Sequence, residues 1–162
     1  MNKTLLGLSI LAALSAVSTA TAAEKVGFFL VGGQYEKDIN ATDSYRVGVG
    51  LPLVGLFGSG GVIALSGDVS YLRHTAPATT GAFQPYYGGG LGLGTVFATT
   101  GSSSAAVFSL SPNVLGGANH AFTDQWSAFA EASAGPTVIL GGGGAHIGLG
   151  FGVRFGANYK LR

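Results

Sequence analysis

Apolar residues alternate with glycine or polar residues along most of this chain, and the last stretch shows the pattern best. Between residues 146 and 160 the odd positions carry apolar or aromatic side chains, whereas the even positions carry glycine or polar groups. Successive residues of a β-strand point to opposite faces of the sheet. The pattern therefore predicts a strand with one apolar face and one face of glycine and polar groups.

Similar period-two alternation recurs along the chain, and no segment shows a convincing helical period. Seven segments stand out, at 26–36, 44–54, 61–73, 83–98, 104–120, 125–138 and 145–160. Membrane barrels made of one bacterial chain normally have an even number of strands. We therefore expect eight strands, with one strand hidden or two boundaries misplaced. Prolines within the segments predict bulges or strand ends at Pro52, Pro85, Pro112 and Pro136.

The composition separates a membrane barrel from a soluble sheet. Charged residues make up 9% of the chain, against about 25% in ordinary soluble domains. The non-apolar face of the segments is mostly glycine and small residues, which suits a narrow lumen better than a surface in water. After the first 22 residues no apolar run is long enough for a spanning helix. The fold class expected is all-β: an antiparallel, up-and-down transmembrane β-barrel.

The first 22 residues have the features of a secretory signal peptide. Lys3 precedes an apolar run over residues 5–17, and an Ala-x-Ala site allows cleavage after Ala22 or Ala23. The run is shorter than the ~20 residues that span a bilayer as a helix. We expect residues 1–22 to be the signal peptide and residues 23–162 to be the barrel domain. The chain has no cysteine, which excludes structural disulfides.

The second half of the chain resembles the OmpA-type and OmpX-type family of small outer-membrane barrels. Residues 83–94 look like the family's glycine-rich strand that opens with a Pro-Tyr pair, and residues 126–131 resemble a later strand with an inward Glu. Arg154-Phe155 is similar to a common ending of the closing strand, although this chain runs on to Arg162. The resemblance covers about residues 83–162. It implies an eight-stranded barrel in the bacterial outer membrane, with outer-membrane lipid and the barrel-assembly machinery as partners.

Four charged residues fall on the faces expected to point inward: Arg46, Asp68, Glu131 and Arg154. Arg46 and Asp68 lie symmetrically about residues 55–60, and Glu131 and Arg154 lie about residues 140–145, so hairpins would bring each pair together. A charge in a narrow barrel is costly unless it is paired. We expect two acid–base pairs, or one network of four, that plug the lumen.

Aromatic residues gather near the ends of the segments, where membrane barrels carry aromatic girdles at the two lipid–water interfaces. Core packing in a soluble sheet is the alternative for these side chains. The candidate interface residues are Tyr35, Tyr45, Tyr71, Tyr86, Tyr87, Trp126 and Tyr159.

Candidate chemistry is sparse. The chain has three histidines, His74, His120 and His146, and none is spaced from another as in a zinc site. The glycine-rich residues 88–94 are not followed by a helix, as a phosphate-binding loop would be. A formal charge of +1 gives no reason to expect nucleic-acid binding. We expect no enzymatic activity, no catalytic residues, no cofactor and no metal.

Three functions are compatible with these features of the sequence. The first is a structural outer-membrane barrel that supports envelope integrity, with its lumen plugged by paired charges. The second is a narrow, porin-like channel for ions or very small solutes. The third is a secreted soluble β-sandwich or adhesion module, which would purify without detergent.

Overall fold

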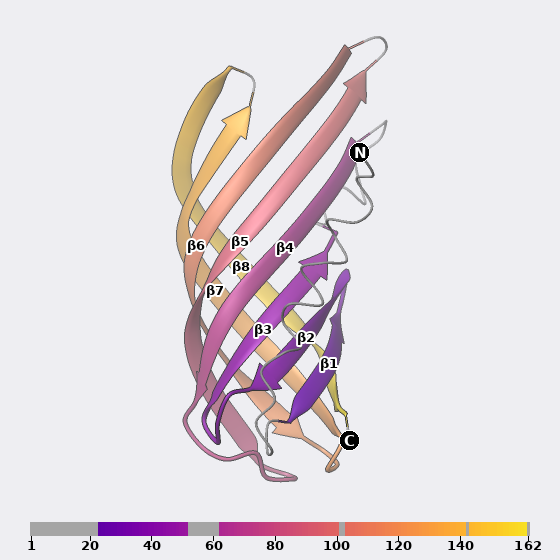
Figure 1. Ribbon diagram of the computed structural model, residues 1–162, viewed down its shortest axis with the longest axis vertical. Helices are drawn as coiled ribbons and strands as arrows, with labels where there is room; N and C mark the ends of the chain where they lie inside the picture. The colour runs from indigo at the N-terminus through magenta and orange to yellow at the C-terminus, as the bar shows by residue number, and fades with distance from the viewer. Residues whose placement is uncertain (1–22, 52–61, 101–102, 142, 162) are drawn as a thin grey trace.

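The computed structural model describes residues 23–51, 62–100, 103–141 and 143–161, and these residues form a closed antiparallel barrel (Figure 1). Each strand pairs with the next along the chain, and β1 closes the ring against β8. The strands are β1 (Glu24–Phe29), β2 (Gly32–Asp38), β3 (Asp43–Gly50), β4 (Val62–His74), β5 (Phe83–Thr100), β6 (Ser103–Ala121), β7 (Trp126–Gly141) and β8 (Gly144–Lys160). The all-β, up-and-down architecture and the expected eight strands are confirmed, and the closed ring rules out the β-sandwich alternative. The described residues contain no helix long and apolar enough to cross a membrane.

The hidden eighth strand lies in the segment that the alternation assigned to a single strand at 26–36. The chain turns at Leu30 and Val31, and this turn separates β1 from β2. Both turn residues are apolar, so no ordinary turn residue marks the reversal. Gly32 and Gly33 directly after the turn are the one local signal for it.

The remaining strand boundaries lie close to those expected from the sequence. The strands from β4 to β8 each begin within two residues of the corresponding segment. β3 ends at Gly50 rather than at 54, and the rest of that segment lies outside the described residues, apart from Leu51. The expected signal peptide, residues 1–22, and Pro52 also lie outside them.

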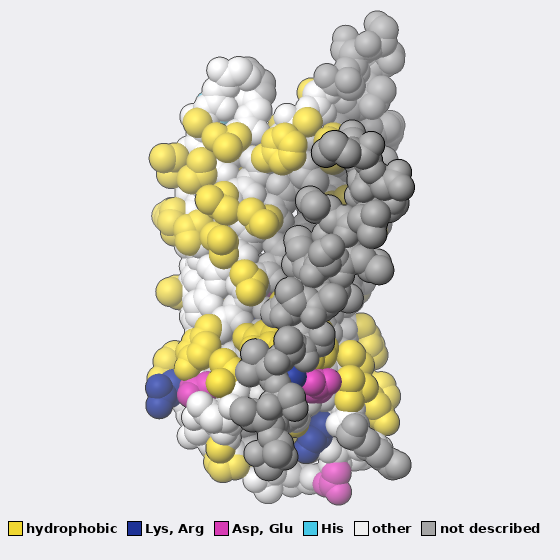
Figure 2. All heavy atoms as spheres, in the orientation of Figure 1, with side chains coloured by type: hydrophobic (Ala, Val, Ile, Leu, Met, Phe, Trp, Pro, Cys, Tyr) yellow, Lys and Arg dark blue, Asp and Glu magenta, His cyan; other side chains and the backbone are white. Residues whose placement is uncertain are grey.

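The two faces of the strands differ as the alternation predicts. The outward residues of β8 are strongly exposed and apolar, with Ile147, Phe151 and Val153 at 78%, 82% and 80%. Most buried polar or charged side chains instead point inward, among them Glu36, Arg46 and Glu131. Figure 2 shows hydrophobic side chains over much of one face of the barrel and charged ones near one end.

The barrel wall is uneven in height. β1, β2 and β3 have six, seven and eight residues, whereas β4 to β8 have 13 to 19. A strand needs about 9–11 residues to span a bilayer. The full ring therefore closes only near the end where β1 begins and β8 ends, which we call the terminal end, and β4 to β8 continue toward the opposite, far end (Figure 1).

The prolines were expected at bulges or strand ends, and the described strands show a strand end near Pro85 but no bulge. Pro85 lies near the start of β5 and keeps its pairing with Ala118. Between β6 and β7 the pairing stops after Leu110↔Val138 and resumes at Val114↔Ala134 in the same register. A bulge would shift the register by a residue, so this is an interruption of the ladder and not an insertion.

The lumen as candidate functional site

The four charged residues expected in the lumen form one connected network. Arg46 Nη2 lies 2.7 Å from Glu131 Oε2, and Arg154 Nη1 lies 2.9 Å from Asp68 Oδ1. Arg154 Nη2 also lies 3.0 Å from Glu131 Oε1, which joins the two pairs. The side chains of Arg46 and Glu131 are only 1% and 3% exposed. Two positive and two negative charges therefore balance within the buried interior.

Both of the main pairs cross the barrel. Arg46 belongs to β3 and Glu131 to β7, while Asp68 belongs to β4 and Arg154 to β8. In a ring of eight strands, partners four strands apart lie on opposite walls. The two ion pairs thus run across the lumen in different directions, and the Arg154–Glu131 contact links them between neighbouring strands.

One of the two expected pairs differs in its partner. Glu131 and Arg154 are direct cross-strand neighbours, but Arg46 contacts Glu131 and not Asp68. In the β3–β4 hairpin Arg46 lies opposite Ser70, and Asp68 lies opposite Gly48. Symmetry about the loop would place Arg46 opposite Asp68, but the observed register places them one inward layer apart. Phe29 covers the Arg154 guanidinium, with 5.1 Å from its ring centroid to the Arg154 Cζ.

Tyr86 corrects one assignment to the aromatic girdles. Its side chain is buried in the lumen, and its hydroxyl donates to Glu131 Oε2 over 3.1 Å. Tyr86 packs there with Leu72 and Leu115 in an apolar cluster. Tyr86 and Gln84 lie on the same face of β5, because they are two residues apart, whereas Tyr87 lies on the opposite face. This alternation indicates an inward side chain at Tyr86.

The other six aromatic candidates all lie toward the terminal end and not at both ends. Trp126 packs against Tyr159, with 5.0 Å between ring centroids, and Tyr35 packs against Tyr45 at 6.5 Å. Tyr71 and Tyr87 are 47% and 55% exposed. These residues form an outward aromatic ring around the part of the barrel in which all eight strands are present.

A second charged cluster lies in the lumen nearer the terminal end. Lys25 Nζ lies 2.7 Å from Glu36 Oε1 and 3.2 Å from Asp38 Oδ1. His74 Nε2 lies 3.6 Å from Glu36 Oε1 and 3.2 Å from the Ser44 hydroxyl oxygen. Glu36, Ser44 and His74 are nearly or fully buried. This cluster was not expected from the sequence, because the β1–β2 turn was not recognised and the inward face of residues 26–36 was therefore undefined.

The Ser44, His74 and Glu36 side chains do not form a catalytic triad. In such a triad the serine and the carboxylate contact opposite nitrogens of the histidine ring. Here both contact Nε2, and among the described residues Nδ1 has no hydrogen-bond partner. Ser44 is also fully buried. The geometry therefore offers no activated nucleophile.

The same cluster has the composition of a metal site. Glu36, Asp38 and His74 each place one ligand atom within 4.8 Å of the others. The Lys25 ammonium group already lies within hydrogen-bond distance of both carboxylates. A cation from the chain itself therefore occupies the position between the two acidic side chains.

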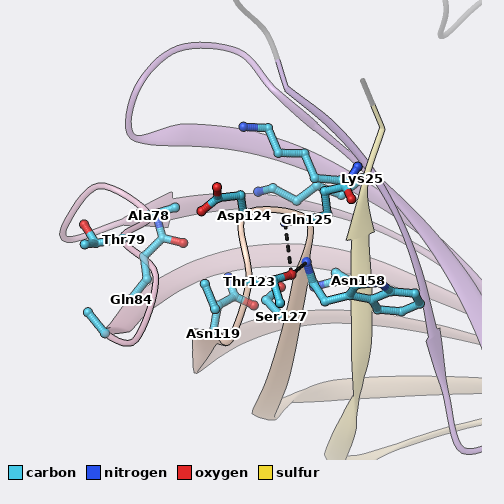
Figure 3. A pocket seen from close by; sticks show the side chains of 14 residues that line it. Lys25, Ala78, Thr79, Gln84, Asn119, Thr123, Asp124, Gln125, Ser127 and Asn158 are labelled. Carbon is cyan, nitrogen blue, oxygen red and sulfur yellow. Dashed lines mark hydrogen bonds between the residues drawn. The ribbon is translucent and has the colours of Figure 1, made fainter.

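A small pocket opens beside this cluster at the terminal end (Figure 3). Its volume is about 60 Å³, room for a few water molecules only. Gln84, Asn119 and Asn158 line it from β5, β6 and β8, together with Lys25 and the Asp124 turn. Amide groups of this kind bind water and neutral polar groups, and the pocket is too small for a larger ligand.

Comparisons with known proteins agree with this architecture. No protein-family model matches the chain, and no curated protein matches it. The chain is similar to the N-terminal β-barrel domain of Pseudomonas aeruginosa OprF, with 14% identity, a TM-score of 0.55, and coverage of 86% of this chain and 95% of that one. A major outer membrane protein from Thermus thermophilus aligns at 14% identity over 86% of this chain and 98% of that one, with a TM-score of 0.48. The chain thus has the fold of a small eight-stranded outer-membrane β-barrel, as the alternation and the resemblance of residues 83–162 predict.

Proposed function

We propose that this chain is a structural β-barrel of the bacterial outer membrane that supports envelope integrity, and that paired charges plug its lumen. The role is not enzymatic, and the partner of the outer wall is outer-membrane lipid. The observation that carries the proposal is the pair of crossing ion pairs, Arg46–Glu131 and Asp68–Arg154, which join opposite walls of the barrel.

The size of the barrel supports a plugged lumen. An eight-stranded barrel has an interior just wide enough for side chains. Here the charged network shares that interior with the bulky side chains of Leu72, Tyr86 and Phe129, all of which are buried. The Lys25–Glu36–His74 cluster adds a second polar layer nearer the terminal end. A continuous aqueous path for ions would have to pass both layers.

The outer surface supports a location in lipid. The outward side chains of β8 are apolar and strongly exposed from Ile147 to Val153. Such a continuous apolar surface is unfavourable in water and favourable against acyl chains. The structural similarity to the OprF barrel domain agrees with this location.

Conductance across a planar lipid bilayer tests the plug. We expect the unmodified barrel to be silent and the double variant Arg46→Ala/Glu131→Ala to conduct, because removing both partners opens one crossing while charge stays balanced. Asp68→Ala/Arg154→Ala removes the other crossing and serves as the second variant. Asn119→Ala, a buried lumen residue outside the network, is the control and should stay silent.

Each barrel is first checked by its heat-dependent shift on a gel, which reports a folded detergent-resistant barrel. Steady conductance of the unmodified protein would favour the narrow-channel function instead. Silence of both folded double variants would show that the ion pairs do not close the lumen.

A further inference from the structure

Among the described residues, β8 pairs with β1 only over residues 156–160, and the ladders between consecutive strands are interrupted at one place, between β6 and β7. The pairing lapses over residues 111–113 and 135–137, and the register on either side places Pro112 directly opposite Pro136. Both prolines share the outward face with Leu110 and Val138. The interruption therefore lies in the wall itself, with strand pairing on both sides of it.

On the sides away from the interruption, the ladders continue through prolines. The β5–β6 ladder continues through Pro85↔Ala118 and through Leu91↔Pro112. The β7–β8 ladder likewise continues through Pro136↔Leu149. A strand residue directs its N–H and C=O to one neighbouring strand, and proline has no N–H to donate. When two prolines lie directly opposite each other, both N–H groups that would form the hydrogen bonds of that residue pair are missing.

The two strands nevertheless touch at the interruption. A Cβ added to Gly135 would collide with the carbonyl oxygen of Pro112. The Ser111 and Thr137 hydroxyls, which face inward, form a hydrogen bond of 2.9 Å across the same place. In this structure the wall is therefore closed here by side-chain and van der Waals contact and not by backbone pairing.

A cavity of about 150 Å³ lies at the interruption. β6, β7 and β8 line it, and its inward-facing lining includes the polar side chains of Ser111, Asn113, Ser133 and Thr137. On the β8 side, Gly150 and Gly152 make room for the Thr137 and Ser133 side chains, whose hydroxyl oxygens lie 2.5 Å and 2.7 Å from where a Cβ would be. The described lining contains no charged side chain.

We propose that the Pro112–Pro136 seam, which side-chain contact closes in this structure, opens laterally and lets small uncharged molecules dissolved in the bilayer reach the lumen cavity at Ser133 and Thr137. Prolines and apolar side chains face the lipid at the seam, and hydroxyl and amide groups face the cavity. This combination fits a neutral amphiphile with a short alkyl chain and excludes ions.

The cavity lies beyond the charged network as seen from the terminal end. Ser133 follows Glu131 by one inward layer in β7, and Gly152 precedes Arg154 by one in β8. A molecule that enters at the seam would therefore reach the interior without passing the ion pairs. The inference rests on the proposed location of the barrel in a membrane, but it does not require the lumen to conduct.

Single-cysteine labelling tests the opening, because the chain has no cysteine of its own. Ser133→Cys places one thiol in the cavity. The barrel is reconstituted in phosphatidylcholine vesicles and treated either with an N-alkyl maleimide that partitions into the bilayer or with a sulfonated, water-soluble thiol reagent. Labelling rates are compared between Ser133→Cys and Ser133→Cys/Pro112→Val/Pro136→Val, in which both N–H donors are restored.

We expect the alkyl maleimide to label the valine variant about tenfold more slowly, as two restored backbone hydrogen bonds imply, while the rate with the water-soluble reagent stays the same. Ser133→Cys/Pro85→Val is the matched control, since Pro85 lies in an uninterrupted ladder, and its rates should equal those of Ser133→Cys. Ser133→Cys/Pro112→Val restores one donor and gives a second test if the triple variant does not fold.

Equal labelling by the alkyl maleimide with and without the prolines would overturn the lateral opening. A slowing of both reagents to the same degree would also overturn it, because the entry path would then be aqueous. Failure of the unmodified chain to form a heat-modifiable barrel in vesicles would count against the proposed membrane function instead, so the two failures are distinguishable.

Discussion

At the scale of single residues, the lumen side chains depend on partners that are distant in the sequence. Arg46 and Glu131 are 85 residues apart, and Asp68 and Arg154 are 86 apart. Glu131 also accepts from the Tyr86 hydroxyl, so one carboxylate serves three other residues. Removal of one member of such a group leaves a buried charge without its partner, which is more costly than removal of both.

This coupling predicts a non-additive mutant cycle. Arg46→Met should lower the free energy of unfolding by about 3–5 kcal/mol, the usual cost of breaking a buried ion pair. Arg46→Met/Glu131→Met should lower the free energy of unfolding by less than the sum of the two single variants. In the double variant neither Arg46 nor Glu131 remains as a buried charge without its partner, and Arg154 keeps Asp68 as its partner. Urea-induced unfolding in lipid vesicles measures all four proteins. Strict additivity would show that the Arg46–Glu131 contact contributes no coupling.

At the scale of the strands, glycine sets where bulky lumen side chains can be placed. A Cβ on Gly117 of β6 would lie 2.7 Å from the Tyr86 hydroxyl and 2.5 Å from the Ala130 carbonyl oxygen. A Cβ on Gly48 of β3 would come within 3.0 Å of Arg154 Nη1. By contrast, no atom of the described residues lies within 4 Å of the Cβ position at Gly148 of β8. Gly117 and Gly48 therefore make room for neighbouring groups in the lumen, whereas Gly148 lies in open space.

Two alanine substitutions distinguish these roles. Gly117→Ala should destabilise the barrel by about 1–3 kcal/mol, the usual cost of overpacking, because the clash involves backbone as well as Tyr86. Gly148→Ala should change stability by no more than about 0.5 kcal/mol. The midpoint of urea unfolding is the measurement. Equal midpoints for the two variants would contradict the close packing around Gly117.

At the scale of the whole molecule, the outward surface decides between lipid and water as the surroundings. Val153 is 80% exposed on the outer face of β8. At an exposed position of a soluble protein, a charged substitution has little effect on stability. On the lipid face of a membrane barrel, an arginine costs about 2–4 kcal/mol at the bilayer midplane.

Val153→Arg therefore tests the membrane location independently of the plug. We expect a loss of about 2–4 kcal/mol in vesicles, whereas Ala78→Arg, in the exposed terminal-end segment between β4 and β5, should change stability by about 0.5 kcal/mol or less. Equilibrium unfolding in vesicles measures both variants. An unchanged stability of Val153→Arg, or a barrel that stays monodisperse without detergent, would contradict a lipid-facing β8.

Most of the strand plan was predictable from the sequence. Period-two alternation is a local property, so β4 to β8 could be located from their own residues, and the same parity would have placed Tyr86 inward. The β1–β2 turn was not predictable in this way, because Leu30 and Val31 are apolar and extend the strand pattern across the reversal. The candidate charges could be identified for the same local reason: each lies at an inward position of its strand.

The partners of those charges were decided only by the tertiary structure. The register of every hairpin and the closure of β1 against β8 decide which residues meet across the lumen. A hairpin drawn symmetrically about its loop misses the observed β3–β4 register by one inward layer. The opposition of Pro112 and Pro136 has the same origin, since it depends on the register of β6 against β7. The sequence by itself determined which side of each strand is apolar, because that alternation is local. The contacts across the barrel were left to the folded ring, because they join residues that no local pattern relates.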